Sequence, residues 1–146
     1  MDEVEYFATA QLGTVKIDPS SLINFSEGIP GFEQFTHYLI LTIEKYVPFQ
    51  WLQSIEEPKL SLPIIQPALL YPEYNPTISF RDLQMVKLER FEDAEIYFIT
   101  TIGQQPNDVT VNLRAPLVVN RKERLGKQCI VTETSFSLRY PILTNK

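Results

Sequence analysis

The sequence predicts an all-β fold of the sandwich or barrel kind. Short segments rich in β-branched and aromatic residues recur about every 8–12 residues with turn residues between them, which is typical of sandwiches and barrels rather than of βαβ units. Helical periodicity is weak along the whole chain. Eleven prolines punctuate it, and each confines its neighbours to edges, turns and loops.

Alternation of apolar and polar residues predicts the individual strands. Val109–Leu113 alternates as a sheet with one buried face requires, and residues 15–17 do so over a shorter length. Within residues 94–102, Ile96, Phe98 and Ile102 share one face. The remaining predicted strands are 4–8, 38–43, 49–55, 60–65, 85–89, 117–120 and 127–132.

One short helix is predicted at residues 79–86. Ser79 precedes Asp82 by three residues, as in a capping box, and Phe80, Leu83 and Val86 follow at helical spacing. A helix this short needs tertiary packing to be stable.

Length and charge limit the possible classes of protein. A chain of 146 residues with 44% hydrophobic content fits one domain, residues 1–146. No apolar run is long enough to span a membrane, and the acidic N-terminus leads into no signal core, so we expect a cytoplasmic protein. The net charge of −5 argues against direct nucleic-acid binding and favours a basic protein partner, although a charge of this size also serves solubility.

Residues 24–33 form the most specific segment of the sequence. They contain Gly28, Pro30 and Gly31 between apolar and acidic side chains. Glycine supplies backbone angles that other residues resist, and proline fixes its own φ, so the segment specifies a compact turn that Phe25 and Phe32 can anchor.

A search for catalytic or metal-binding residues finds no convincing set. His37 is the only histidine and Cys129 the only cysteine, and neither has a partner at a suggestive spacing, so we expect structural roles for both. Glu56 and Glu57 are adjacent, which in a strand points them to opposite faces, so a charged turn is the better interpretation. Residues 121–127 are basic and are interpreted as a solvated hairpin loop. We expect no metal and no cofactor.

Residues 69–76 combine leucines and tyrosines with two prolines. Such a segment forms neither a long helix nor a central strand. Its tyrosines suit a protein interface, where the ring is buried and the hydroxyl stays wet, and equally suit a lid over the core. The residues leave both interpretations open.

Several segments, in order along the chain, together resemble the bacterial flagellar assembly factor family FliW. The resemblance runs from about residue 13 to about residue 131. The matching segments are 25–33, 52–58, Pro67 with 71–74, 111–120 and 126–128.

The resemblance implies a small, mainly antiparallel β-barrel with one or two short helices and no catalytic activity. It also implies two protein partners, the translational regulator CsrA and flagellin. In that picture the protein antagonises repression of flagellin mRNA translation by CsrA, and accumulating flagellin competes for it and restores repression. No nucleic acid or membrane is contacted directly.

We expect the partner-binding surface to have two parts, both at matching segments. The first part comprises Glu27, Ile29, Phe32 and Glu33. The second part comprises Glu56, Glu57, Tyr71, Glu73 and Tyr74. Asn112 and Asn120 are equally suited to satisfying loop backbone groups.

Two other functions remain as alternatives. One is a chaperone that stabilises flagellin before export and has no role in translation. The other is a small enzyme that uses Glu56 or Glu57.

Overall fold

The computed structural model describes residues 5–105 and 108–142. Most of its regular structure is β, in short strands. The strands are β1 (Glu5–Ala8), β2 (Thr14–Ile17), β3 (Ile23–Asn24), β4 (His37–Leu41), β5 (Gln50–Ser54), β6 (Ser61–Ile65), β7 (Glu95–Ile102), β8 (Val109–Val111), β9 (Leu117–Asn120), β10 (Leu125–Gln128) and β11 (Tyr140–Pro141). The described chain has one α-helix, α1 (Phe80–Met85), and four 3-10 turns, η1 (Pro19–Ser21), η2 (Glu44–Tyr46), η3 (Pro67–Leu69) and η4 (Phe91–Asp93).

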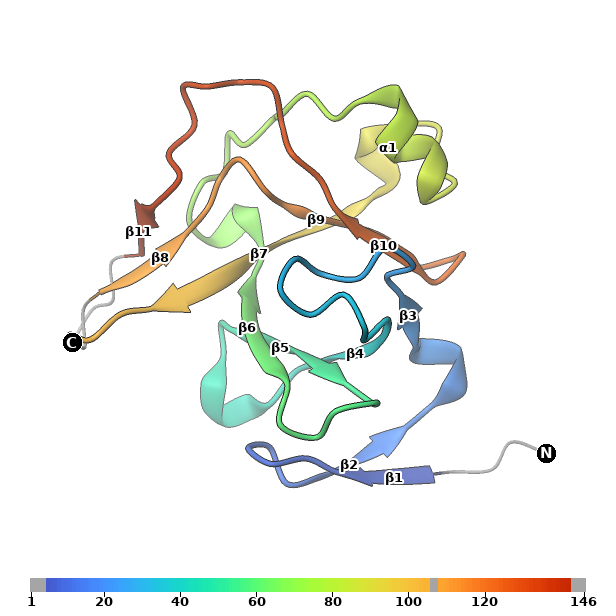
Figure 1. Ribbon diagram of the computed structural model, residues 1–146. Helices are drawn as coiled ribbons and strands as arrows, with labels where there is room; N and C mark the ends of the chain where they lie inside the picture. The colour runs from blue at the N-terminus through green and yellow to red at the C-terminus, as the bar shows by residue number, and fades with distance from the viewer. Residues whose placement is uncertain (1–4, 106–107, 143–146) are drawn as a thin grey trace.

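Seven strands close into a barrel in the order β7-β6-β5-β4-β3-β10-β9, and β9 pairs back onto β7 (Figure 1). Every pairing around the ring is antiparallel except that between β3 and β10. That parallel pairing matches only Leu125 with Asn24. The barrel therefore has a short seam between β3 and β10.

Alternation along the strands separates an inner core from an outer one. In β9, Leu117 and Val119 belong to the barrel interior, whereas Val118 points outward to α1. In β7, Tyr97 faces the interior and Phe98 the outside. Both strands are buried on both faces because other elements cover the outside of the barrel.

Two of the elements that cover the outside of the barrel are α1 and the β1–β2 hairpin. Helix α1 and the turn after it place Leu83, Val86 and Leu88 on Val118, and the β1–β2 hairpin, a separate two-stranded sheet, places Val15 and Ile17 on Leu39. Figure 1 shows α1 and the hairpin at opposite ends of the barrel.

Beyond the barrel, a three-stranded extension projects to the lower left of Figure 1. It consists of residues 100–102 of β7, together with β8 and β11, and we call it the arm. Within it Thr100 pairs with Val111, Ile102 with Val109, and Tyr140 with Val111. These side chains therefore share one face of the arm.

The predicted all-β barrel is confirmed, and so is the helix at 79–86. Ser79 Oγ accepts a hydrogen bond from the Asp82 backbone N–H at 3.0 Å, as an N-cap should. Most predicted strands are present within one or two residues, and Val4, the first residue of one of them, lies outside the described residues.

Two strand predictions were wrong in whole or part. Residues 85–89 form the end of α1 and a turn, because the Asn120 side chain donates to the carbonyls of Val86 and Lys87 and holds Lys87 at a φ of 60°. The strand predicted at 127–132 is β10, which lies earlier at Leu125–Gln128. The two-residue strands β3 and β11 are too short to show a periodic pattern.

Candidate functional site

The turn segment of residues 25–36 connects β3 to β4 and lies within the ring of barrel strands in Figure 1. It folds through successive tight turns, in which Gly28 N–H donates to the Phe25 carbonyl at 2.7 Å and Phe32 N–H to the Ile29 carbonyl at 2.7 Å. Gly28 has a φ of +72°, and a Cβ there would lie 2.5 Å from Glu33 Cα. Only glycine fits this position.

Apolar side chains anchor the turn segment inside the barrel. Phe25 is fully buried, packs edge-on against Tyr38 with ring centroids 5.5 Å apart, and lies against Gly126. Ile29 is 2% exposed. The expectation that Ile29 lies on the surface is therefore wrong, because the turn carries its side chain into the barrel core.

Phe32 stays partly outside, with 36% of its surface exposed, at a hollow of about 300 Å³. The turn segment, the start of β6, the second half of β7, the β8–β9 connection and the end of β10 form the walls of this hollow. We call it the turn hollow, and its lining residues are Ile29, Pro30, Phe32, Leu62, Ile99, Thr101, Asn112, Ala115 and Gln128.

An ion-pair network fixes the turn segment to α1. The ammonium of Lys127 lies 2.7 Å from Glu27 Oε1 and 3.7 Å from Asp82 Oδ1, and its side chain is only 16% exposed. Burial alone would lower the pKa of Lys127, but the two carboxylates raise it above its usual value. Lys127 is therefore charged at neutral pH and joins β10, the turn segment and the helix.

The other predicted acidic residues brace turns. Glu33 Oε2 accepts from Gly31 N–H at 3.2 Å within the turn segment. Glu56 Oε1 accepts from the backbone N–H groups of Thr36 and His37, at 2.7 and 3.1 Å, so the β5–β6 turn is tied to the end of the turn segment. Glu57 accepts from Lys59 N–H at 3.0 Å. Residues 54–60 are a charged turn, as predicted.

Tyr71 and Tyr74 lie on the other face of β7. Tyr74 stacks edge-on against Phe98 at 4.8 Å and donates its hydroxyl to the Leu113 carbonyl at 2.5 Å; Tyr71 packs against Tyr74 and Tyr140. Burial raises the pKa of the Tyr74 hydroxyl. Of the two interpretations for this segment, the packing supports the lid. Of its three predicted site residues, Tyr71 and Tyr74 are half-buried and Glu73 is exposed.

The structure thus divides the predicted surface. It brings Glu56 next to the turn segment that carries Glu27, Phe32 and Glu33, and it separates Tyr71, Glu73 and Tyr74 from them. The opposite faces of β7 explain the separation, since Ile99 and Thr101 line the turn hollow whereas Phe98 contacts Tyr74. None of these contacts tests partner binding, which stays a prediction.

The groups considered for chemistry have structural surroundings. Cys129 is 1% exposed, and burial raises the pKa of its thiol to about 12. His37 Nδ1 lies 2.9 Å from Thr36 Oγ1 and 3.7 Å from Glu56 Oε2. Within residues 5–105 and 108–142, no three His, Cys, Asp or Glu side chains gather as a metal site would require.

Two residues that hold these segments in place were not among the site residues predicted from the sequence. Lys127 was predicted only as part of a basic loop, yet it pins the turn segment. Arg114 donates to the carbonyls of Phe136 and Thr134, at 2.8 and 2.5 Å, and so fastens the segment that covers Tyr74. Spacing along the chain gives no signal for such long-range pairs. Asn112 and Asn120 satisfy backbone groups, as expected.

Comparison with known proteins decides the family. The family model described as FliW protein matches residues 6–142. The chain belongs to the FliW family. The relative from Leptospira biflexa, named flagellar assembly factor FliW, is 37% identical over 136 residues, covering 92% of this chain and 89% of that protein.

Further FliW proteins agree with this assignment. The flagellar assembly factor FliW of Alkaliphilus metalliredigens is 35% identical, covering 92% of this chain and 84% of that protein. A crystal structure titled as the flagellar assembly factor FliW superposes with a TM-score of 0.86 at 32% identity, over 97% of this chain and 99% of that chain. The resemblance to FliW is therefore confirmed in sequence and in fold.

In the part of the chain that the structure describes, no helix has the length and apolar character needed to cross a membrane.

Proposed function

We propose that this chain is a flagellar assembly factor that acts in the cytoplasm by binding CsrA and flagellin and has no catalytic activity. Its membership of the FliW family supports the flagellar role. The observation that carries the binding role is Phe32, an aromatic side chain 36% exposed on a fixed turn beside a hollow of about 300 Å³.

The turn segment is ready to bind without rearrangement. Its backbone turns are closed by internal hydrogen bonds, Ile29 anchors it from below, and Lys127 holds Glu27 at its side. A surface fixed in advance loses little conformational entropy when a partner docks, so more of the contact energy appears as affinity. Aromatic anchors at a hollow are the usual centre of such interfaces.

Charge favours a basic partner. The chain carries a net charge of −5, and the exposed carboxylates of Glu27 and Glu33 flank the turn that bears Phe32. Complementary charge speeds the encounter of two proteins more than it strengthens the final complex. An RNA-binding regulator such as CsrA presents the basic surface that this arrangement suits.

Under this proposal the protein acts as a titration switch. While it holds CsrA, translation of flagellin mRNA is released from repression. When unexported flagellin accumulates, flagellin occupies the protein, CsrA is freed, and repression returns.

Isothermal titration of the purified protein with CsrA, and separately with flagellin, both from the same organism, tests the proposal. We expect saturable binding to each and competition between them. Phe32→Ala should weaken CsrA binding at least about tenfold, the loss expected from truncating an interface anchor. Phe80→Ala is the matched control, because Phe80 is 69% exposed on α1, away from the turn hollow.

The other outcomes separate the alternatives. Binding of flagellin alone would replace the switch with an export chaperone, and binding of neither would contradict the proposal. Equal losses of CsrA affinity for Phe32→Ala and Phe80→Ala would show that the turn segment is not the contact surface. An association rate for CsrA that does not fall as salt rises from low to physiological concentration would remove the electrostatic argument.

A further inference from the structure

Strand β7 loses its neighbour on one side where it enters the arm. Its pairing with β6 runs through Ile65↔Phe98 and Ile64↔Ile99, and the next residue of β6 is Pro63, which has no N–H to give to the Thr100 carbonyl. Over the described residues, β7 continues past Ile99 paired only with β8. Residues 100–102 therefore form an open sheet edge.

The hydrogen-bond pattern shows which backbone groups this edge presents. Gly103 N–H donates to the Asp108 carbonyl at 2.6 Å, and the Val109 carbonyl accepts from Ile142 N–H at 2.8 Å, so Val109 is turned towards β11 and away from Ile102. In an antiparallel pair the bonding residues alternate. Thr101 and Gly103 consequently bond to the β8 side, and the Ile102 N–H and C=O point out of the open edge.

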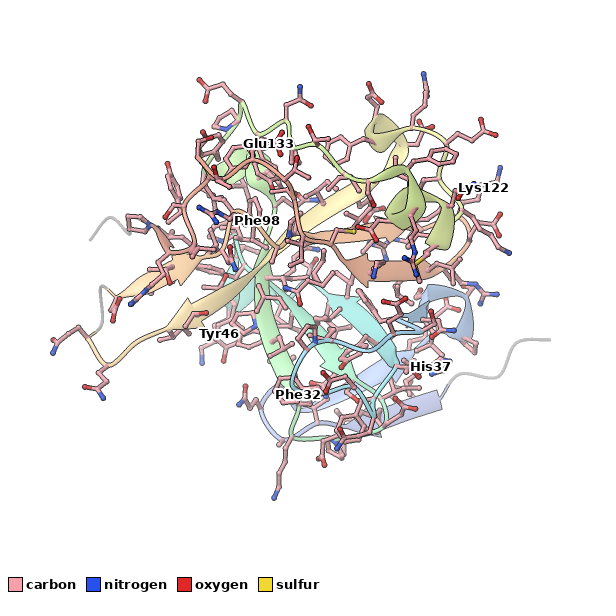
Figure 2. The ribbon with its side chains drawn as sticks, turned by 45° about the horizontal axis from the view of Figure 1, so that its top comes forward. Phe32, His37, Tyr46, Phe98, Lys122 and Glu133 are labelled. Atoms are coloured by element: carbon pink, nitrogen blue, oxygen red, sulfur yellow. The ribbon has the colours of Figure 1, made fainter. Side chains whose placement is uncertain are left out.

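A hollow of about 240 Å³ lies beside this edge, and its exposed walls are entirely apolar. We call it the arm slot. One wall is the arm, and the other comes from η2, β5 and β6; Figure 2 shows Tyr46 below the arm and Phe98 where the arm leaves the barrel. The lining residues are Tyr46, Phe49, Trp51, Pro63, Thr100, Ile102 and Val109.

Two polar atoms in the arm slot have no hydrogen-bond partner. Thr100 is only 5% exposed and its Oγ1 is unpaired, and Trp51 Nε1 is likewise buried and unpaired. Buried polar groups are normally satisfied. Both atoms are covered in the free protein, so they become available to an incoming backbone once the side chains that carry them rotate.

The edge also lacks the usual protection. Natural sheets block exposed edges with charges, prolines or covering segments. Here the edge residues are Thr100, Thr101 and Ile102, and Ile102 is 64% exposed. Val47, next to η2 on the opposite side of the slot, is 56% exposed as well.

We propose that the arm slot binds an extended apolar segment of a partner protein, which adds to the β7 edge as a further strand. Its backbone bonds to Ile102 and to the Thr100 carbonyl, and alternate side chains enter the slot. After the Thr100 and Trp51 side chains rotate, its carbonyls accept from Thr100 Oγ1 and Trp51 Nε1. Because the slot is walled on both sides, it suits a single strand better than a folded surface. This site is separate from Phe32, which lies on the other face of β7.

Fluorescence gives a direct test, because Trp51 is the only tryptophan of the chain. The probe is a peptide of alternating valine and threonine with a lysine at each end. We expect a saturable change in Trp51 emission below about 1 mM, the weak end of the affinity scale. The same peptide with its backbone amides N-methylated on one edge should bind at least about tenfold more weakly, since it cannot complete the strand.

Substitutions locate the binding. Ile102→Lys should weaken peptide binding at least about tenfold, whereas Ile130→Lys, at an isoleucine that is 70% exposed outside the slot, should leave it unchanged. Thr100→Val removes the hydroxyl and keeps the shape, and should weaken binding by a smaller factor. Phe32→Ala should leave peptide binding intact, so this proposal and the proposed function fail in different experiments.

Amide hydrogen exchange reports the edge itself. In the free protein the Ile102 amide should exchange quickly while those of Thr101 and Gly103 are protected, and the peptide should protect Ile102. Three outcomes would overturn the proposal: no saturable emission change, equal binding of the N-methylated peptide, or slow exchange of Ile102 in the free monomer. A dimer detected by ultracentrifugation and abolished by Ile102→Lys would assign the slot to a second copy of the chain instead.

Discussion

The turn segment and the arm differ in how completely their polar groups are hydrogen-bonded. The turn segment is irregular in backbone yet fixed by several hydrogen bonds, a buried Phe25 and the Lys127 ion pairs. The arm is regular in backbone yet leaves a strand edge, an exposed Ile102 and an unpaired Thr100 hydroxyl. In this protein the irregular segment is the rigid one, and the regular sheet offers the unsatisfied surface.

The difference shows why regular structure is a poor guide to rigidity. A loop is stable when each of its backbone groups has a partner, and a strand at an edge has partners on one side only. Substitutions that test backbone fit should therefore be costly in the turn segment and cheap in the arm.

Glycine substitutions give the largest expected contrast. Gly28→Ala should destabilise the protein by about 3 kcal/mol, since it adds a Cβ 2.5 Å from Glu33 Cα at a φ of +72°. Gly103→Ala at the tip of the arm meets only the Asp108 side chain, which can rotate away, and should cost less than about 1 kcal/mol. Urea unfolding monitored by circular dichroism measures both, and equal costs would contradict the comparison.

The packing of the turn segment inside the barrel can be tested at Gly126. A Cβ there would lie 2.6 Å from Phe25 Cζ, inside the closed core. We expect Gly126→Ala to cost about 2 kcal/mol through overpacking. Phe25→Leu should recover part of that loss in the double variant, and simple addition of the two single costs would show that the residues do not share this space.

Alkaline pH should destabilise the packing of α1 on the barrel, where Cys129 is buried. Burial raises the folded-state pKa of Cys129 from 9.0 to about 12, so the unfolded chain ionises first and stability falls between these values as pH rises. By pH 10 the loss is about 1.4 kcal/mol. The measurement is the difference in urea stability between wild type and Cys129→Ala from pH 8 to 10; a constant difference would show that the thiol titrates normally.

A carboxylate beside each region gives the smallest contrast. Glu56→Ala removes an acceptor from two backbone N–H groups, at 2.7 and 3.1 Å, and should cost about 1 kcal/mol. Asp108→Ala, next to the arm, removes only a 3.8 Å exposed pair with Arg139, and we expect a change below about 0.5 kcal/mol. Thermal unfolding of the two variants side by side decides whether the order holds.

The sequence predicted the fold well where the signal is local. Alternation in residues 109–113, the Ser79 cap and the glycines of the turn segment each describe a few consecutive residues, and all three agree with the structure. The strand prediction for residues 85–89 is wrong because their conformation is set by Asn120, which lies more than thirty residues away along the chain.

The candidate site was predictable only in part, for the same reason. The pattern around Gly28 indicated a specified turn but not which side chains it buries, so Ile29 was assigned to the surface. The arm slot carries no local signal at all. It arises because Pro63 ends the β6–β7 pairing and because β5 and η2 happen to face the edge that is left.

The seam of the barrel determines where the barrel opens during local unfolding. Strands β3 and β10 meet at the single pairing of Leu125 with Asn24, and Phe25 fills the space beside it that Gly126 leaves open. A ring joined by so few bonds at one point opens there before it opens elsewhere. Since the turn segment begins at this point, a partner that grips it would act as a clasp and slow the opening of the whole barrel.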